Sequence, residues 1–237
     1  MHGTTVATNA VLEGKGVRTV YIGNRGLGDL LTIGRQARRE LYALQPPAES
    51  PPVPPELCLE TGGRLDAQGR TLEALSPADR AKLRRDLERL QPRAVAINLL
   101  FSYLDDRHER AIEALVPAGV FVSRSSRVLP EIREYERGMA TWLNAWIGPR
   151  VAGYLRRLGA GLPGAAVSVM QSSGGTVSAH QAGRGSVRLL LSGPAGGLAG
   201  ARFVGESAGG GRIGVAGILA RRQERRLPVA PHAQAVG

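Results

Sequence analysis

Two glycine-rich turns in the second half of the chain are the segments whose residue types most suggest chemistry. Their small and polar residues are Ser173, Gly174 and Gly175 in the first turn and Gly193, Gly196 and Gly197 in the second. We expect each turn to follow a strand and to lead into a helix, because the apolar runs AVSVM and SVRLLL precede them. Such turns direct backbone N–H groups and a helix N-terminus towards one point, which suits phosphate or carboxylate groups. Glycine also serves plain turns and close helix packing, so neither turn alone identifies a site.

A second group of polar residues stands at the start of the chain, where the sequence predicts the polar end of a strand followed by a short helix that ends near Gly14. This group consists of Thr4, Thr5, Thr8 and Asn9. Their hydroxyl groups and the free N–H groups of a helix start can hold phosphates or steady an oxyanion. The structural alternative is that Thr4 or Thr5 is an N-cap and Asn9 a solvated helix residue.

The long apolar-periodic segment 131–159 predicts an amphipathic helix that continues past Pro149. We expect its tryptophans to pack in the core rather than to form a ligand cage. The charged residues near its start are Glu131, Arg133, Glu134 and Arg137. We predict that these four form surface pairs at helical spacing, with a catalytic carboxylate among them as the alternative.

Composition limits the remaining classes of function. The net charge is +11, yet nearly all of the basic residues are arginines spread along predicted helices. We therefore predict solvated helix faces and no specific nucleic acid, with an arginine-rich nucleic-acid binder as the weaker alternative. Cys58 is the only cysteine and the four histidines have no paired ligand spacing, so no metal site is predicted. No leader or membrane-spanning run is evident, which predicts a cytoplasmic protein without membrane contact.

The elements that must position these residues alternate between strands and helices. The sequence predicts strands at 18–23, 94–100 and 120–123, a hairpin around DAQG, and a helix that Ser76 caps. The proline-rich segment 45–56 predicts an extended connection. This order of elements is typical of an α/β fold.

Four sequence blocks in order resemble the hydantoinase A and 5-oxoprolinase family. They are HGTTVATNAVLEGKG, LPEIREYER, VMQSSGGTVSA and LLLSGPAGGLAGA. The resemblance spans residues 2–209 and implies an actin or sugar-kinase-like (ribonuclease H-like) α/β fold with mixed sheets and flanking helices, here incomplete. It also implies ATP-dependent opening of a cyclic amide, hydantoin or 5-oxoproline, or in related members ATP-dependent carboxylation of a ketone.

The resemblance assigns roles to the polar groups described above. The threonine and asparagine group and the first glycine turn become candidates for substrate or phosphate binding, and the second glycine turn becomes the candidate for nucleotide binding. The resemblance implies ATP and Mg²⁺ as cofactors, a small cyclic amide as substrate and a hydantoinase B-like second subunit as partner. It assigns no catalytic residue in this chain.

The resemblance also predicts how the chain is organised. We expect residues 1–129 to be a remnant of the N-terminal domain, 130–209 the start of the hydantoinase A domain and 210–237 a tail outside the family pattern. Family members carry Asp-Gly-Gly-Thr phosphate loops before the first block and after the last one, and neither loop is present in this sequence. We therefore expect an internal fragment of a larger enzyme, with an inactive fragment or an interaction module as the alternative.

Overall fold

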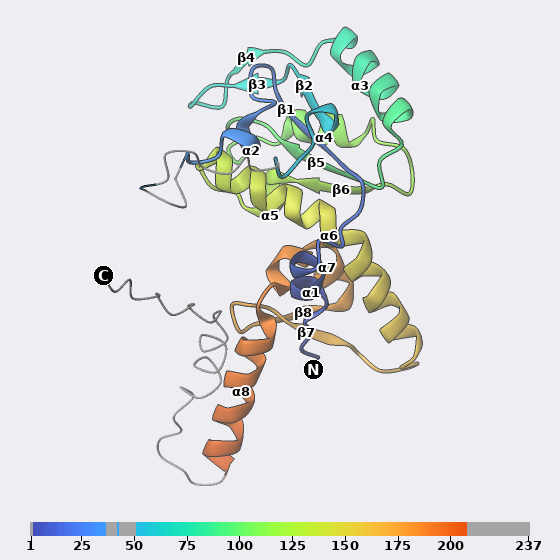
Figure 1. The fold of residues 1–237 in the computed structure, drawn as a ribbon, viewed down its shortest axis with the longest axis vertical. Coiled ribbons are helices and arrows are strands. Elements are labelled where there is room, and N and C mark those ends of the chain that lie inside the picture. Colours follow the sequence, from blue (N-terminus) through green and yellow to red (C-terminus); the bar gives the residue numbers. More distant parts are fainter. Residues whose placement is uncertain (1, 37–41, 43–50, 208–237) are drawn as a thin grey trace, which may run out of the picture.

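The computed structural model describes residues 2–36, 42 and 51–207, so the predicted tail 210–237 and the first part of the proline-rich connection lie outside the described residues (Figure 1). The elements before the longest helix are α1 (Val6–Leu12), β1 (Thr19–Asn24), α2 (Leu30–Ile33), η1 (Pro55–Leu57), β2 (Cys58–Thr61), β3 (Arg64–Leu65), β4 (Thr71–Glu73), α3 (Pro77–Leu90), β5 (Ala94–Asn98), α4 (Arg107–Glu113), β6 (Phe121–Arg124) and α5 (Ser125–Val128). The later elements are α6 (Glu134–Ala160), β7 (Ser168–Met170), β8 (Thr176–Ser178), α7 (Ala179–Arg184), η2 (Ser186–Leu189) and α8 (Ser192–Ser207).

A four-stranded parallel sheet with the order β2-β1-β5-β6 forms the centre of the first half of the chain. Ile22 of β1 stands opposite Leu59 on one side and Ile97 on the other. Every residue of β1 and β5 is buried, as expected for parallel strands that are covered on both faces. The predicted α/β architecture is confirmed, with antiparallel pairing confined to the hairpins β3-β4 and β7-β8 among the described strands.

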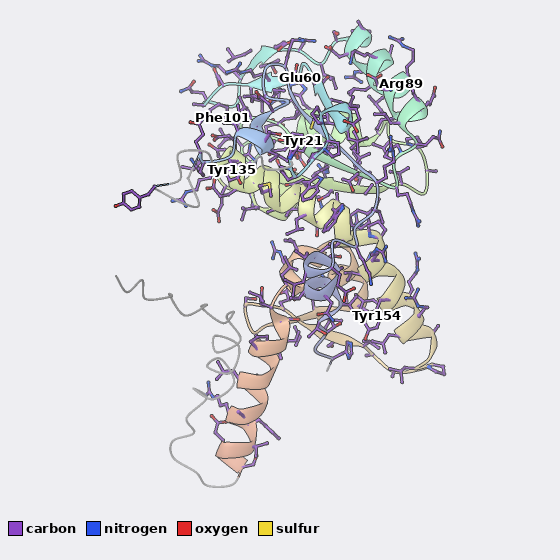
Figure 2. The ribbon with its side chains drawn as sticks, viewed as in Figure 1. Tyr21, Glu60, Arg89, Phe101, Tyr135 and Tyr154 are labelled. Atoms are coloured by element: carbon purple, nitrogen blue, oxygen red, sulfur yellow. The ribbon has the colours of Figure 1, made fainter. Side chains whose placement is uncertain are left out.

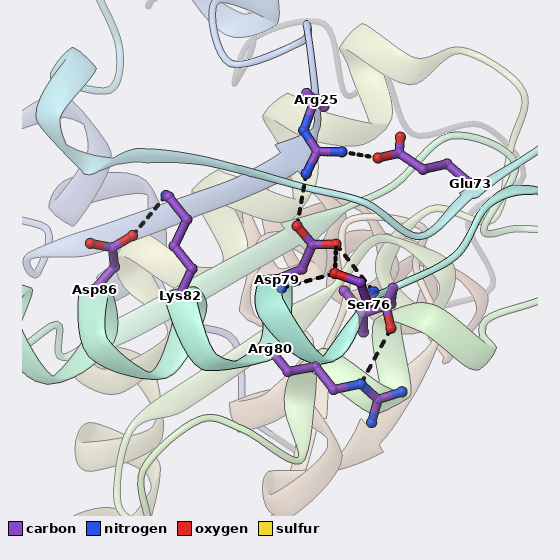
Figure 3. Close-up of polar contacts among 8 residues, drawn as sticks. Arg25, Glu73, Ser76, Asp79, Arg80, Lys82 and Asp86 are labelled. Carbon is purple, nitrogen blue, oxygen red and sulfur yellow. Dashed lines mark hydrogen bonds and ion pairs between the residues drawn. The ribbon is translucent and has the colours of Figure 1, made fainter.

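Helix α3 begins where the sequence places its cap. The Ser76 Oγ accepts a hydrogen bond from the Asp79 N–H at 3.1 Å, and the Asp79 carboxylate accepts one from the Ser76 N–H at 3.1 Å (Figure 3). Arg25 contacts the same carboxylate at 2.7 Å and also pairs with Glu73. Burial alone would raise the pKa of Asp79, but the Ser76 hydrogen bonds and the Arg25 charge outweigh it and lower the pKa.

Helix α6 runs through both halves of the molecule (Figure 1). Its first part packs against the parallel sheet, and its second part carries Ile147, Val151 and Leu155 into a second apolar cluster with α1, β7, α7 and η2. Trp142 packs against the apolar cluster around the parallel sheet, and Trp146 packs against the second cluster. The two indole rings are stacked, with their centroids 5.4 Å apart. The predicted long helix is confirmed, and both tryptophans pack against the apolar clusters as expected, although each is only half-buried.

Arg137 is buried, so the predicted surface pairing of this residue is wrong. Its guanidinium Nε donates to Asn98 Oδ1 at 3.0 Å and to Ser125 Oγ at 3.1 Å, and Nη2 donates to the Leu99 carbonyl at 2.8 Å. Residue 137 lies on the helix face that meets the sheet, and its fixed hydrogen-bond acceptors compensate for the cost of burying the guanidinium group. Glu131 and Arg133 are exposed, and among the described residues no ion pair joins any of the four charged residues near this helix start.

Tyr21 belongs to the same buried network, and Figure 2 shows it among the strands of the parallel sheet. Its hydroxyl accepts a hydrogen bond from Asn98 Nδ2 at 2.9 Å. Burial raises the pKa of Tyr21 to about 12, and the hydrogen bond from Asn98 opposes the shift. Tyr154, in the second part of α6, lies outside this network, and its hydroxyl is hydrogen-bonded to His2 Nε2 at 2.8 Å (Figure 2).

The segments around both glycine-rich turns fold differently from the prediction. The run SVRLLL is no strand: residues Ser186–Leu189 form the 3₁₀ helix η2, with Leu189 buried and Leu191 exposed. After β7 the first turn leads back into strand β8, and only then into α7. The expected pair of strand-to-glycine-to-helix units is therefore not formed. None of the helices in the described part of the chain has the length and apolar composition needed to cross a membrane.

Candidate functional site

The start of the chain and the start of α8 meet, although they are far apart in sequence. The His2 N–H donates to the Ser168 carbonyl at 2.8 Å and the Met170 N–H donates to the His2 carbonyl at 2.9 Å, so this first segment lies alongside β7. The Ser192 hydroxyl then donates to the Thr4 carbonyl at 3.0 Å. The His2 bonds therefore fix the start of the chain on β7, and the Ser192 bond holds Thr4 against the first turn of α8.

A hollow of about 410 Å³ opens between these segments. It is lined by Gly3, Thr4, Thr5, Met170, Gly193, Gly196 and Gly197. The structure thus brings together the predicted phosphate-binding candidates Thr4 and Thr5 and all three predicted nucleotide-binding glycines. We refer to these seven residues as the threonine–glycine pocket. Sequence reasoning missed Gly3 and Met170, although both stand within blocks that carry the family resemblance.

The glycines keep this pocket open. A Cβ atom added at Gly193 would lie 3.5 Å from Cγ2 of Thr5, and one added at Gly196 would lie 3.9 Å from Cγ of Met170. Any longer side chain at either position would extend into the hollow. The first turn of the 16-residue helix α8 also has backbone N–H groups without helical partners, and these attract anions.

The two threonines of the pocket differ in exposure, but both can donate a hydrogen bond to a ligand. Thr4 is buried, and its Oγ1 accepts a hydrogen bond from the Val6 N–H at 3.2 Å. Thr5 occupies the N-cap position of α1 but makes no side-chain cap, and its exposed Oγ1 lies 3.5 Å from Asn9 Nδ2. A hydroxyl that accepts one hydrogen bond retains its own proton for a further acceptor. Both threonines therefore retain the donor that an anionic oxygen requires.

The other predicted residues lie outside this pocket. Thr8 has a supporting position, because its Oγ1 accepts a hydrogen bond from the Leu191 N–H at 3.0 Å. Asn9 is exposed and lines a separate surface hollow that Arg150 also lines. Ser173, Gly174 and Gly175 form the exposed turn of the β7-β8 hairpin, where Gly174 has a φ of +89°.

The residues of the pocket do not fit a magnesium ion. Its lining contains no carboxylate, and Mg²⁺ in phosphate sites is normally bound through one or two carboxylates together with the phosphates. No group of three or more His, Cys, Asp or Glu side chains gathers anywhere in residues 2–36, 42 and 51–207. Hydroxyl and backbone donors instead make the pocket suited to a phosphate oxygen.

Comparison with known proteins extends the likeness across most of the chain. The hydantoinase/oxoprolinase N-terminal region matches residues 1–118, and the hydantoinase/oxoprolinase model matches residues 137–214. The caprolactamase subunit alpha of Pseudomonas jessenii is 34% identical over 211 residues, which are 82% of this chain and 29% of that protein. The 5-oxoprolinase 1 of Arabidopsis thaliana is 31% identical over 223 residues, which are 84% of this chain and 17% of that protein.

Two solved structures share the fold. A nucleotide-free acetone carboxylase structure matches 87% of this chain and 32% of its own with a TM-score of 0.76 and 26% identity. The ATP-dependent caprolactamase of Pseudomonas jessenii matches 86% of this chain and 31% of its own with a TM-score of 0.71 and 30% identity. The chain thus spans between 17% and 32% of the length of the relatives and solved chains that it matches here. The predicted actin-like fold is confirmed, and the chain belongs to the hydantoinase/oxoprolinase family.

Proposed function

We propose that this chain supplies one wall of the phosphate site in an enzyme that opens a cyclic amide with ATP. The observation that carries the proposal is the threonine–glycine pocket, in which Thr4 and Thr5 meet the start of α8. Relatives named 5-oxoprolinase and caprolactamase support a lactam as the substrate class. The likeness to acetone carboxylase supports ketone carboxylation as a second candidate.

The chain's own residues have three roles in this proposal. The hydroxyls of Thr4 and Thr5 and the N–H groups of the first turn of α8 donate to phosphate oxygens. Gly193 and Gly196 allow a phosphate to approach the backbone, and the Ser192 bond to Thr4 keeps the two segments in place. ATP, when bound, supplies a phosphoryl group that activates the amide carbonyl for attack by water. No step is assigned to magnesium, because the pocket offers no ligand for it.

The proposal extends to organisation and partners. We infer a division into residues 1–129, 130–209 and 210–237, of which the last range lies outside the described residues. Relatives named as an alpha subunit and a gamma subunit support a second, hydantoinase B-like subunit as a partner. Magnesium would then be held by residues beyond this pocket, and the cytoplasm is the proposed location.

The test is a titration of the ¹⁵N-labelled chain with Mg-ATP, followed by NMR. We expect the amide signals of Thr5 and Gly193 to shift, with a Kd in the millimolar range, because phosphate donors are present without carboxylates for the metal. A low-micromolar Kd would contradict the inferred lack of magnesium ligands. Signals that shift only outside the pocket would refute its assignment as a phosphate site.

A matched pair of variants on α8 separates the pocket from the helix itself. Gly196→Val places a side chain in the pocket, whereas the Cβ at Gly200, one turn later, has no atom within 4 Å. Both substitutions change helix propensity equally. We expect Gly196→Val to abolish the ATP-dependent shifts and Gly200→Val to preserve them. Equal effects of the two variants would show that the pocket is not the binding site.

A further inference from the structure

A second hollow, of about 270 Å³, lies at the carboxyl end of β6, away from the threonine–glycine pocket. Its walls come from β6 and α5 on one side and from the β7-β8 hairpin, α7 and η2 on the other. Four arginines line it, and the only carboxylate in its lining is that of Glu113. The four are Arg124, Arg127, Arg184 and Arg188. We call this hollow the arginine cavity.

The carboxylates near the cavity neutralise only one of its arginines. Arg124 is buried, with 9% of its side chain exposed, and it pairs with Asp106 at 2.6 Å and with Glu113 at 2.8 Å. Within the described part of the chain, Arg127, Arg184 and Arg188 make no ion pair. Three guanidinium groups therefore line one hollow without a bound counter-charge from these residues.

The size of the cavity and its other lining residues limit the kind of ligand that it can bind. Its volume is just below the range of about 300–1,000 Å³ that is typical of sites for drug-sized molecules, which favours a compact ligand. The side chains of Gln171 and Gln181 add neutral polar groups, and Val177 and Val187 add apolar surface. Guanidinium groups recognise carboxylate and phosphate oxygens through paired, charge-assisted hydrogen bonds.

We propose that the arginine cavity binds a compact anion with two or more negative charges, carried by phosphate or carboxylate groups. The proposal goes beyond the proposed function, since the two hollows share no lining residue. The backbone passes from one to the other between Met170, which lines the threonine–glycine pocket, and Gln171, which lines the arginine cavity.

Calorimetric titration of the full chain with pyrophosphate and, separately, with malonate tests the proposal and distinguishes the two chemical sources. We expect saturable binding of at least one anion, and the tighter of the two identifies the group that the cavity prefers. Arg184→Gln and Arg188→Gln should each weaken that binding about tenfold, the loss expected from one charge-assisted hydrogen bond. Because both side chains are exposed and unpaired among the described residues, both variants should remain folded.

Two control arginines make the outcome specific. Arg156 is an exposed arginine of α6 that lines neither the arginine cavity nor the threonine–glycine pocket. Arg150 lines the separate surface hollow that Asn9 of α1 also lines. Arg156→Gln and Arg150→Gln should leave anion binding unchanged. Absence of binding, or equal losses in the control and cavity variants, would overturn the proposal. NMR shifts confined to Thr5 and Gly193 would place the anion in the threonine–glycine pocket and would likewise overturn it.

Discussion

Replacing Arg137 with methionine should destabilise the protein severely, although the residue contacts none of the proposed ligands. Methionine keeps much of the apolar stem but removes every guanidinium donor. The buried Asn98 Oδ1 would lose its hydrogen bond from residue 137, and the buried Leu99 carbonyl would keep only the hydrogen bond that it accepts from the Ser102 N–H at 3.3 Å. Ser125, which donates to the buried Glu109 carboxylate at 2.6 Å, would lose the hydrogen bond that its Oγ accepts from Arg137 Nε.

The expected loss in the free energy of unfolding follows from those lost hydrogen bonds. Each buried acceptor that is left unsatisfied costs about 1–3 kcal/mol, and removing one partner of a buried charged network costs about 3–5 kcal/mol. The remaining hydrogen bond of Arg137, to the carbonyl of exposed Glu131 at 2.6 Å, is the one that water can replace. We therefore expect a loss of about 3–5 kcal/mol, which lowers the thermal midpoint by roughly 10 °C in a chain of this size.

Urea unfolding followed by circular dichroism measures this loss, with Arg133→Met as the matched control. Arg133 stands one helical turn earlier, is exposed, and makes no ion pair among the described residues, so its replacement should change the free energy of unfolding by less than about 0.5 kcal/mol. Arg137→Lys should lose an intermediate amount, because an ammonium group keeps the charge but not the forked geometry. An Arg137→Met variant within about 1 kcal/mol of the parent chain would refute this account of the network.

Three further predictions test the packing, the free thiol and the helix cap. Gly148→Ala should cost about 1–3 kcal/mol in urea unfolding, because its Cβ would overlap the Phe121 ring. Gly153→Ala on the same helix meets only ordinary contacts and should be neutral or stabilising, so equal losses would contradict this packing. Burial raises the pKa of Cys58 to about 11, so iodoacetamide should modify it roughly a hundredfold more slowly at pH 7 than it modifies glutathione, as mass spectrometry would measure. Because the folded-state pKa of Asp79 is lowered, its stabilisation is present above the unfolded pKa of about 3.9 and is lost as pH falls through the folded value. The urea midpoint of Asp79→Asn should therefore fall less between pH 5 and pH 3 than that of the parent chain, and parallel pH profiles would contradict the assignment.

Helices and strands with local signals could be predicted from the sequence. The predicted Ser76 cap is followed within one short segment by leucines at helical spacing, and α3 begins at this cap and buries Leu83, Leu87 and Leu90. The β-branched and aromatic run at 18–23 and the apolar run at 94–100 each predicted a strand, and the buried parallel strands β1 and β5 lie there. The hairpin around DAQG formed as β3 and β4, although the run before it split at Gly62 and Gly63 between β2 and β3.

Elements decided by tertiary contacts could not be predicted in this way. Three successive leucines give no period, so strand and helix were indistinguishable at 189–191. The 3₁₀ helix at Ser186–Leu189 is supported by the Asn144 side chain, which accepts a hydrogen bond from the Val187 N–H at 3.1 Å. The burial of Arg137 likewise depends on acceptors from β5 and α5, which a pattern of charges along one helix does not reveal.

The threonine–glycine pocket and the arginine cavity differ in how far they could be predicted from the sequence. Hydroxyl and glycine residues drew attention to Thr4, Thr5 and Gly193 individually, because those residue types suit phosphate at any helix start. Their meeting in one pocket depends on a separation of 188 residues between Thr4 and Ser192, which only the fold spans. The arginine cavity had no such signal, since its cationic residues belong to separate elements within an arginine-rich composition.

Helix α6 connects the two halves in a way that makes their stabilities interdependent. Ala145 is buried in the first cluster and Ile147, two residues later, in the second, so the same turn of helix contributes to both cores. Unwinding that turn would expose both clusters, so local unfolding of α6 in one half would destabilise the other half as well. The threonine–glycine pocket rests on the second cluster, through Ala7 of α1 and Val169 of β7. The buried network around Arg137 therefore supports the proposed phosphate site through the length of α6 rather than through any contact with it.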